Sequence, residues 1–178
     1  CPTEVGEAYA YKADTTAYRN VLDLMLEYSE ESIISFAKGF FHHYTFRNGI
    51  DNVIALLHSL DIKKYETVIV IPITVAPCAC QSMWDYIKTL PNHIQKEYWT
   101  NLNVGIIYEE NAGFIVKKMI EYKRFDRARD IIYHSSHKNV QFDTTIIEET
   151  IIGIIKASDS NLFSRMQYEL AKVVYLLD

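Results

Sequence analysis

The isoleucine-rich stretch at residues 143–157, DTTIIEETIIGIIKA, constrains the fold more than any other part of the chain. Its apolar positions recur at i, i+1, i+4 and i+5, which places them on one face of an α-helix. The residues at this spacing are Ile146, Ile147, Thr150, Ile151, Ile154 and Ile155. Thr145 and Glu148 have the spacing of a capping box that would begin the helix. The periodicity therefore predicts a helix, although isoleucine by itself favours strands.

The same helical spacing recurs along the chain. It predicts helices at about 15–28, from Ser29 to a stop at FRNG (46–49), at 52–60, 79–90, 92–99, 109–122, 124–136, 143–157 and 160–177. Six glycines and four prolines leave little material for the turns of an all-β fold. We therefore expect an all-α chain, an α-solenoid of about eight to ten short helices stacked as antiparallel hairpins.

The segment TVIVIPITVA at residues 67–76 supports two interpretations. Its β-branched residues favour a buried strand, but Pro72 cannot donate to a ladder of hydrogen bonds, and no partner strand is visible. We favour a helix that ends before Pro72, and keep the strand as the alternative.

Domain organisation is expected to be simple. We predict a single all-helical repeat domain over residues 1–178, with an irregular segment allowed at residues 1–14. Because the sequence begins without Met and ends in the apolar LAKVVYLLD, we expect it to be a fragment of a longer chain. The near-continuous apolar run at 68–76 is too short to cross a bilayer, so no membrane segment is expected.

The cysteines and the net charge indicate which cellular compartment and which classes of partner to expect. Cys1, Cys78 and Cys80 are odd in number and lack the spacing of a disulfide framework, which predicts a reducing, cytoplasmic compartment. The net charge of −5 argues against a general nucleic-acid surface. A basic cluster lies within residues 117–129; it is interpreted as the solvated side of a hairpin, or alternatively as a site for an acidic partner or RNA.

Residues Tyr122–Ile132 resemble the turn and second helix of a tetratricopeptide-type repeat, which has an aromatic residue in the turn and an alanine three positions later. Phe125 and Ala128 occupy these positions here. The resemblance implies that Phe125 wedges between two helices and that the small Ala128 lets them approach closely.

Residues 50–157 more widely resemble the helical-repeat region of large bacterial proteins of the tetratricopeptide and HEAT-like α-solenoid type. This resemblance implies a cytoplasmic scaffold that binds a protein partner or the rest of a larger polypeptide. It implies no catalytic residues and no cofactor. The sequence does not indicate an oligomeric state.

One pattern suggests catalysis. Arg129-Asp130 followed by His134 matches the R-x4-H motif of the HEPN ribonucleases, which need no metal. Arginine can stabilise charge on a phosphorane and histidine titrates near neutral pH, so Arg129 and His134 are the candidate catalytic pair of this alternative. The other interpretation is a solvated arginine and a histidine that complements the dipole at a helix C-terminus.

Potential metal ligands are sparse. His134 and His137 are one helical turn apart and could ligate zinc together with the distant Cys78 and Cys80. The adjacent His42 and His43 are less suitable, because neighbouring side chains on a helix point about 100° apart. We expect no metal site and interpret the two later cysteines as small buried residues.

Thirteen tyrosines are more informative as a group. Tyr9, Tyr11, Tyr108 and Tyr133 need not all belong to the core. Exposed aromatic residues on a helical array would anchor a protein-binding face. Alternatively, these tyrosines occupy boundary positions with their hydroxyls in water.

Overall fold

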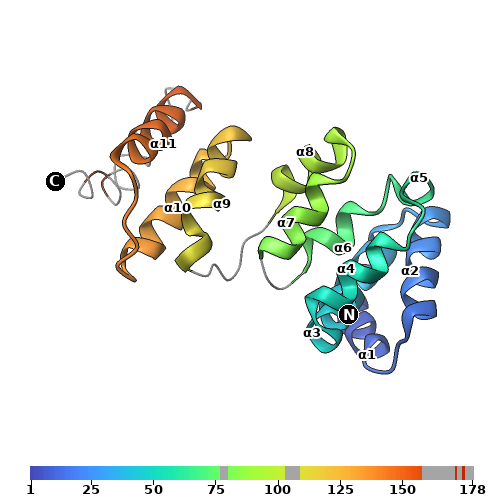
Figure 1. Cartoon of the computed structure of the whole chain (residues 1–178). Coiled ribbons are helices and arrows are strands. Elements are labelled where there is room, and N and C mark those ends of the chain that lie inside the picture. Colours follow the sequence, from blue (N-terminus) through green and yellow to red (C-terminus); the bar gives the residue numbers. More distant parts are fainter. Residues whose placement is uncertain (77–79, 103–108, 158–170, 172–173, 175–178) are drawn as a thin grey trace. The chain divides into compact units, whose positions relative to one another are not determined.

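The computed structural model describes residues 1–76, 80–102, 109–157, 171 and 174, and this part of the chain contains eleven helices and no strand (Figure 1). The predicted all-α class is confirmed for these residues. Where the sequence led us to expect one domain over 1–178, the chain forms two compact units, Cys1–Ile106 and Ile107–Asp178. The predicted helix at 160–177 lies outside the described residues, apart from residues 171 and 174.

The first unit contains eight of these helices: α1 (Pro2–Ala10), α2 (Thr15–Glu27), α3 (Glu31–Asn48), α4 (Ile50–His58), α5 (Ile62–Tyr65), α6 (Val70–Thr74), α7 (Gln81–Lys88) and α8 (Asn92–Asn101). The long α3 is its centre, because α1, α2, α4 and α6 all contact it. The core side chains that are almost completely buried are Tyr18, Leu22, Phe40, Phe41, Leu57, Ile69, Ile73, Met83, Trp84, Ile87, Ile94 and Tyr98.

Several predicted helix limits in this unit are confirmed. α2 matches the stretch expected at 15–28, and α3 ends at Asn48 before Gly49, whose φ of 80° is favourable for glycine. Trp84 on α7 and Trp99 on α8 face each other with ring centroids 6.3 Å apart. The expected cap at Ser29 is wrong, because Glu30 occupies the N-cap of α3.

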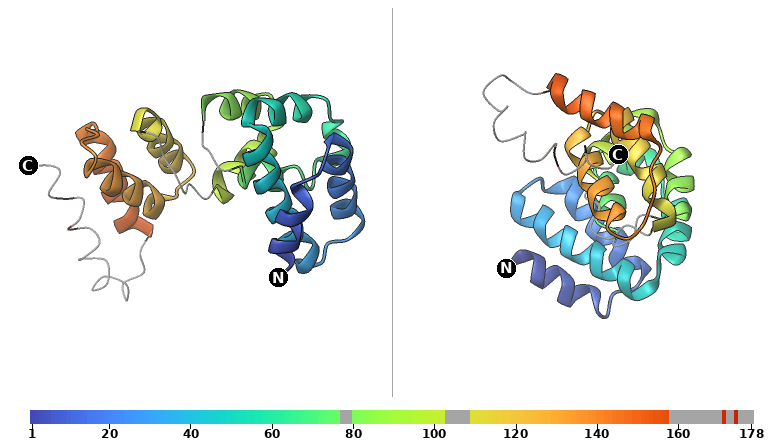
Figure 2. Two further views of the ribbon diagram at one scale, coloured as in Figure 1. Left: turned by 90° about the horizontal axis from the view of Figure 1, so that it is seen from below. Right: turned by 90° about the vertical axis from the view of Figure 1, so that its left-hand side faces the viewer.

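The first helix corrects the expectation of an irregular start. Pro2–Ala10 is helical because Pro2 occupies its first turn and because α1 lies directly against α3 (Figure 2). Gly6 and Gly39 make this approach possible. A β-carbon on Gly6 would overlap the carbonyl oxygen of Phe36, and one on Gly39 would overlap the carbonyl oxygen of Thr3. The two backbones therefore touch where each helix has no side chain.

The interpretation of residues 67–76 also needs correction. The helix does not end before Pro72; α6 runs from Val70 to Thr74 and includes Pro72 as its third residue. Proline is tolerated there because an amide in the first turn has no acceptor within the helix. The side chain of Thr74 donates to the carbonyl of Val70 at 2.7 Å, which helps to close this short helix.

The second unit contains α9 (Glu109–Glu121), α10 (Phe125–Ser136) and α11 (Thr144–Ala157), whose limits agree with the predicted stretches to within one residue. Each of these three helices contacts the other two. Lys123, in the turn between α9 and α10, has a φ of 59°. The fully buried side chains include Ile115, Met119, Ala128 and Ile132.

The start of α11 differs from the predicted capping box. The carboxylate of Asp143, rather than the side chains of Thr145 and Glu148, accepts a hydrogen bond from the backbone N–H of Thr145 at 2.8 Å. Hydrogen bonds from Thr145 lower the pKa of Asp143. An aspartate bonds the free amides of a first turn in the same way as a threonine would. The helix was therefore predicted correctly, but its capping residue was not.

Two buried tyrosines, Tyr18 on α2 and Tyr86 on α7, should lower the free energy of unfolding of the first unit as the pH rises into the alkaline range. Burial raises the pKa of Tyr86 to about 12, and burial together with the nearby Tyr86 and Tyr44 raises the pKa of Tyr18 well above its usual range. A tyrosine in the unfolded chain ionises near pH 10. Between about pH 10 and 12 the unfolded state therefore loses protons that the folded state retains, which favours unfolding.

We expect the urea midpoint, followed by circular dichroism, to fall between pH 10 and pH 12, and to fall less steeply in Tyr86→Phe. A Tyr86→Phe midpoint that falls as steeply as that of the parent would contradict this assignment.

Candidate functional site

Exposed and half-buried aromatic side chains lie near the C-terminal end of α1 and on α3. We call Tyr9, Tyr11, His43 and Phe46 the aromatic face. Phe46 is 73% exposed, Tyr11 66% and Tyr9 50%. The ring of His43 lies between two others, with its centroid 6.4 Å from those of both Tyr11 and Phe46. Single exposed apolar residues are common, but neighbouring exposed aromatic rings are typical of interaction surfaces.

Helical spacing on α3 produces this arrangement. Phe40, Phe41 and Tyr44 point into the core, whereas Phe46 follows them by two to six residues and lies off that buried stripe. His43 and Phe46 are three residues apart, so they are neighbours on the helix surface. Tyr9 connects the face to the core, because its ring centroid is 6.0 Å from that of Phe36 and 5.7 Å from that of Phe40.

Arg47 holds the end of α1 in place beside this face. Its Nη1 donates to the carbonyl of Ala10 at 3.0 Å and to the carbonyl of Tyr11, and its Nη2 donates to the carbonyl of Ala13 at 2.7 Å. These carbonyls lie at and just beyond the C-terminus of α1, where no further helical amide is present to bond them. A cation also complements the negative end of the helix dipole. The guanidinium therefore fixes the backbone that carries Tyr11.

A pocket of about 550 Å³ adjoins the aromatic face. The residues that line it are Ala8, Tyr9, Tyr11, Lys12, Ala13, Asp14 and Ala17. The carboxylate of Asp14 already accepts a hydrogen bond from the backbone N–H of Ala17 at 2.8 Å, as the N-cap of α2. The alanines leave room and the two tyrosines provide aromatic walls, so the pocket suits an apolar or aromatic side chain of a partner.

Arg129 and His134 both lie on α10, and the structure shows how each is held. Nε and Nη2 of Arg129 donate to Oδ1 of Asp130 at 3.1 and 2.7 Å, and the Arg129 side chain is only 18% exposed. His134 is exposed, with its ring edge-on to that of Tyr133. Residues five positions apart on a regular helix are separated by about 140° around its axis. The helix therefore does not direct these two side chains to one point.

The other candidate metal ligands do not gather into one site in the part of the chain that the structure describes. Nδ1 of His137 donates to the carbonyl of Tyr133 at 2.7 Å, and His134 lies one turn away on the same helix. His42 is exposed and His43 belongs to the aromatic face. Cys78 lies outside the described residues, and Cys80 is the half-buried N-cap residue of α7. Among the residues that the structure describes, no three His, Cys, Asp or Glu side chains form a possible metal site.

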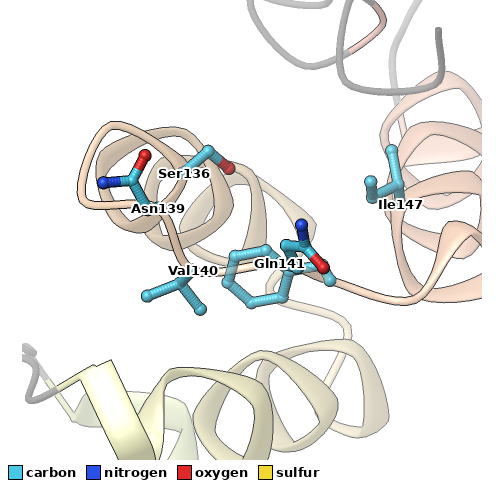
Figure 3. Close-up of a pocket in the computed structure, with 6 residues that line it drawn as sticks. Ser136, Asn139, Val140, Gln141 and Ile147 are labelled. Atoms are coloured by element: carbon cyan, nitrogen blue, oxygen red, sulfur yellow. The ribbon is translucent and has the colours of Figure 1, made fainter.

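A second pocket, of about 410 Å³, lies in the other unit between the end of α10 and the start of α11 (Figure 3). It is lined by Ser136, Asn139, Val140, Gln141, Phe142 and Ile147. Ser136 already donates to the carbonyl of Ile132 at 2.7 Å. None of these residues is titratable at neutral pH, so this pocket offers hydrogen bonding and apolar contact but no group for acid–base chemistry.

The sequence identified part of the aromatic face. Tyr9 and Tyr11 were among the four tyrosines that need not all belong to the core, and both are exposed. Tyr133 is half-buried, and Tyr108 lies outside the described residues. Phe46 and His43 were missed. The position of Phe46, off the stripe of Phe40, Phe41 and Tyr44, is the signal that could have revealed it.

Phe125 and Ala128 both take part in helix packing. Ala128 is fully buried within α10. The ring of Phe125 lies against Gly153 of α11, where a β-carbon would be only 2.5 Å from Cγ of the ring. The sequence predicted α11 itself, but the tetratricopeptide-like pattern did not indicate that Phe125 contacts it.

Comparison of the chain with protein-family models, with curated proteins and with solved structures finds no match. Within the described residues, no helix has the length and apolar character that crossing a membrane requires.

Proposed function

We propose that this protein is a non-catalytic helical module that binds a protein partner through the aromatic face of α1 and α3. The observation that carries the proposal is the exposure of Phe46 and Tyr11 on either side of His43. Aromatic residues contribute large contact areas for little loss of conformational entropy, and they dominate the energetics of many interfaces.

The surroundings of the aromatic face support this role. α1 is held to α3 by backbone contact at Gly6 and Gly39, and Arg47 fixes the segment that follows. A surface that is already ordered loses little entropy when a partner binds. The adjoining pocket would receive one side chain of the partner while the exposed rings cover the contact around it.

We also propose that the helices form part of a cytoplasmic α-solenoid scaffold of the tetratricopeptide-like type. Its support is the mutual packing of α9, α10 and α11, together with the buried Ala128 at the position where such a repeat has an alanine. The free thiols of Cys1 and Cys80 are consistent with a reducing compartment.

Site-specific photo-crosslinking tests the binding role. A benzophenone amino acid is placed at Phe46, at Tyr11 or at Ile152, in cells that naturally express the protein. Ile152 is the matched control because it is an exposed apolar residue on α11, in the other unit. We expect the same partner to be captured from positions 46 and 11 and not from 152. Equal capture at all three positions, or none at 46 and 11, contradicts the proposal.

An RNA-cleavage assay separates this proposal from the HEPN-like alternative. With Arg129 bonded to Asp130 and His134 on another part of the helix surface, we expect the purified protein to leave single-stranded RNA intact. Cleavage that is lost in both Arg129→Ala and His134→Ala would overturn the non-catalytic assignment and establish the ribonuclease.

A further inference from the structure

Apolar side chains cover more of the surface of α11 than its packing against α9 and α10 buries. Ile147 is 3% exposed, whereas Ile151 is half-buried and Ile155 is 47% exposed. These three residues are four positions apart, so they form one row along the helix, which turns gradually out of the core. We call Ile151 and Ile155 the isoleucine row. Because a helix that is apolar on most of its sides is normally buried on most of them, we expect a further element, beyond the described residues, to cover this row.

The sequence after α11 has the apolar spacing of a helix with one buried side. Its apolar residues recur at intervals of three and four residues, namely Leu162, Phe163, Met166, Leu170, Val173 and Leu177. Of residues 158–178 the structure describes Ala171 and Val174, and both are helical and exposed. Neither belongs to that apolar spacing, so their exposure leaves the apolar side of the segment available for packing.

We propose that residues 162–177 form a helix that packs antiparallel on the isoleucine row of α11. The lengths agree, because the 14 residues of α11 extend over about 21 Å and the apolar positions from Leu162 to Leu177 over about 22 Å. Phe163, near the start of the new helix, then lies opposite Ile155, near the end of α11. Ile152, which is 49% exposed, lies about 60° farther round the axis of α11 and stays at the rim of the contact.

The connection after α11 favours this segment over a second copy of the chain as the cover of the row. Ser158, Asp159, Ser160 and Asn161 separate the two helices, and such residues favour turns and helix N-caps. Connections of this length are typical of antiparallel helical pairs. A short tether also holds the segment beside α11 at an effective concentration in the millimolar range, which a second copy in dilute solution does not reach.

Photo-crosslinking in the whole chain tests this packing. A benzophenone amino acid replaces Ile155 in the purified protein, and the products of irradiation are mapped by mass spectrometry. We expect an adduct with residues 162–177 of the same molecule. Glu149 is the matched control position, because it is exposed on α11 but lies about 120° from Ile155 around the helix axis, and we expect no such adduct there. A covalent dimer from position 155, the same adduct from position 149, or no adduct at all overturns the proposal.

Urea denaturation gives a second readout that needs no crosslinker. Ile155→Ala and Phe163→Ala should each lower the folding equilibrium constant of the second unit about tenfold, because each removes one side of a packed pair. The double variant should lose clearly less than the product of the two effects. Val174→Ala is the control, since Val174 is 46% exposed and off the apolar spacing; it should change the constant by less than about twofold and combine additively with Ile155→Ala. An Ile155→Ala variant as stable as the parent, or independent effects of Ile155→Ala and Phe163→Ala, contradicts the packing.

Discussion

Replacing Gly39 or Gly6 by alanine should destabilise the first unit by about 3 kcal/mol, although alanine is the better helix former. The reason is the contact between the backbones of α1 and α3. A β-carbon on Gly39 would overlap the carbonyl oxygen of Thr3 and lie 2.9 Å from its carbonyl carbon. A β-carbon on Gly6 would overlap the carbonyl oxygen of Phe36 and lie 2.9 Å from the amide nitrogen of Phe40. Backbone atoms cannot rotate away as side chains do, so α1 must move off α3.

Urea denaturation and hydrogen exchange measure this effect, and Gly113 is the control. Gly113 is also a helical glycine, in α9, but a β-carbon there would have no heavy atom within 4 Å. Gly113→Ala should therefore stabilise the protein by up to about 1 kcal/mol. In Gly39→Ala we expect fast exchange of the α1 amides. If Gly39→Ala and Gly6→Ala are as stable as Gly113→Ala, the close approach of α1 and α3 is wrong.

In the second unit, Gly153→Ala should destabilise by about 2 kcal/mol. A β-carbon on Gly153 would overlap Cδ1 and Cε1 of the Phe125 ring. Here the obstacle is a side chain, which can move at the expense of its packing. The expected loss is therefore smaller than at Gly6 or Gly39, and it should show as a lower urea midpoint.

A compensating change at Phe125 tests the specific contact. Phe125→Leu alone should destabilise by about 1 kcal/mol, because it removes part of the ring. In the Gly153→Ala/Phe125→Leu double variant the smaller side chain leaves room for the new methyl group, so the combined loss should be less than the sum of the two. Strictly additive losses would show that Phe125 and Gly153 do not share a contact, and that Phe125 does not join α10 to α11.

Much of the helical architecture could be predicted because it depends on local periodicity. The isoleucines at 146–155 predicted α11, and the predicted stop before Gly49 agrees with the observed end of α3. The stretch predicted at 92–99 agrees with α8, and Pro91, directly before it, occupies the N-cap of that helix. These features depend on residues within one or two turns of each other, which a single sequence displays directly.

Features that depend on contacts distant in the sequence could not be predicted. An irregular segment was allowed at residues 1–14, and only the position of Gly6 against Phe36 shows why a glycine is required in the helix there. A helix was expected to end before Pro72, but Pro72 instead lies in the first turn of α6, which begins at Val70. The contact between Phe125 and Gly153 joins residues 28 positions apart, and no periodicity encodes it.

The candidate site was predicted only in part for the same reason. Tyr9 and Tyr11 were among four tyrosines that the sequence suggested need not all belong to the core, with boundary positions as the alternative. Phe46 is apolar, and composition alone would assign it to the core. Its exposure follows from its angle on α3 and from the place where α1 ends, which are properties of the folded unit.

The affinity of the photo-captured partner for defined variants tests the central claim most directly. The purified partner is titrated by calorimetry into the parent protein, into Tyr11→Ser/Phe46→Ser and into Ile152→Ser. Both variants replace exposed hydrophobic side chains by serine, but only Tyr11 and Phe46 belong to the aromatic face. We expect the first variant to bind at least tenfold more weakly, a loss of about 1.4 kcal/mol or more, and Ile152→Ser to bind as the parent does. Unchanged affinity in Tyr11→Ser/Phe46→Ser, with its helicity intact, would contradict a protein-binding role for this face.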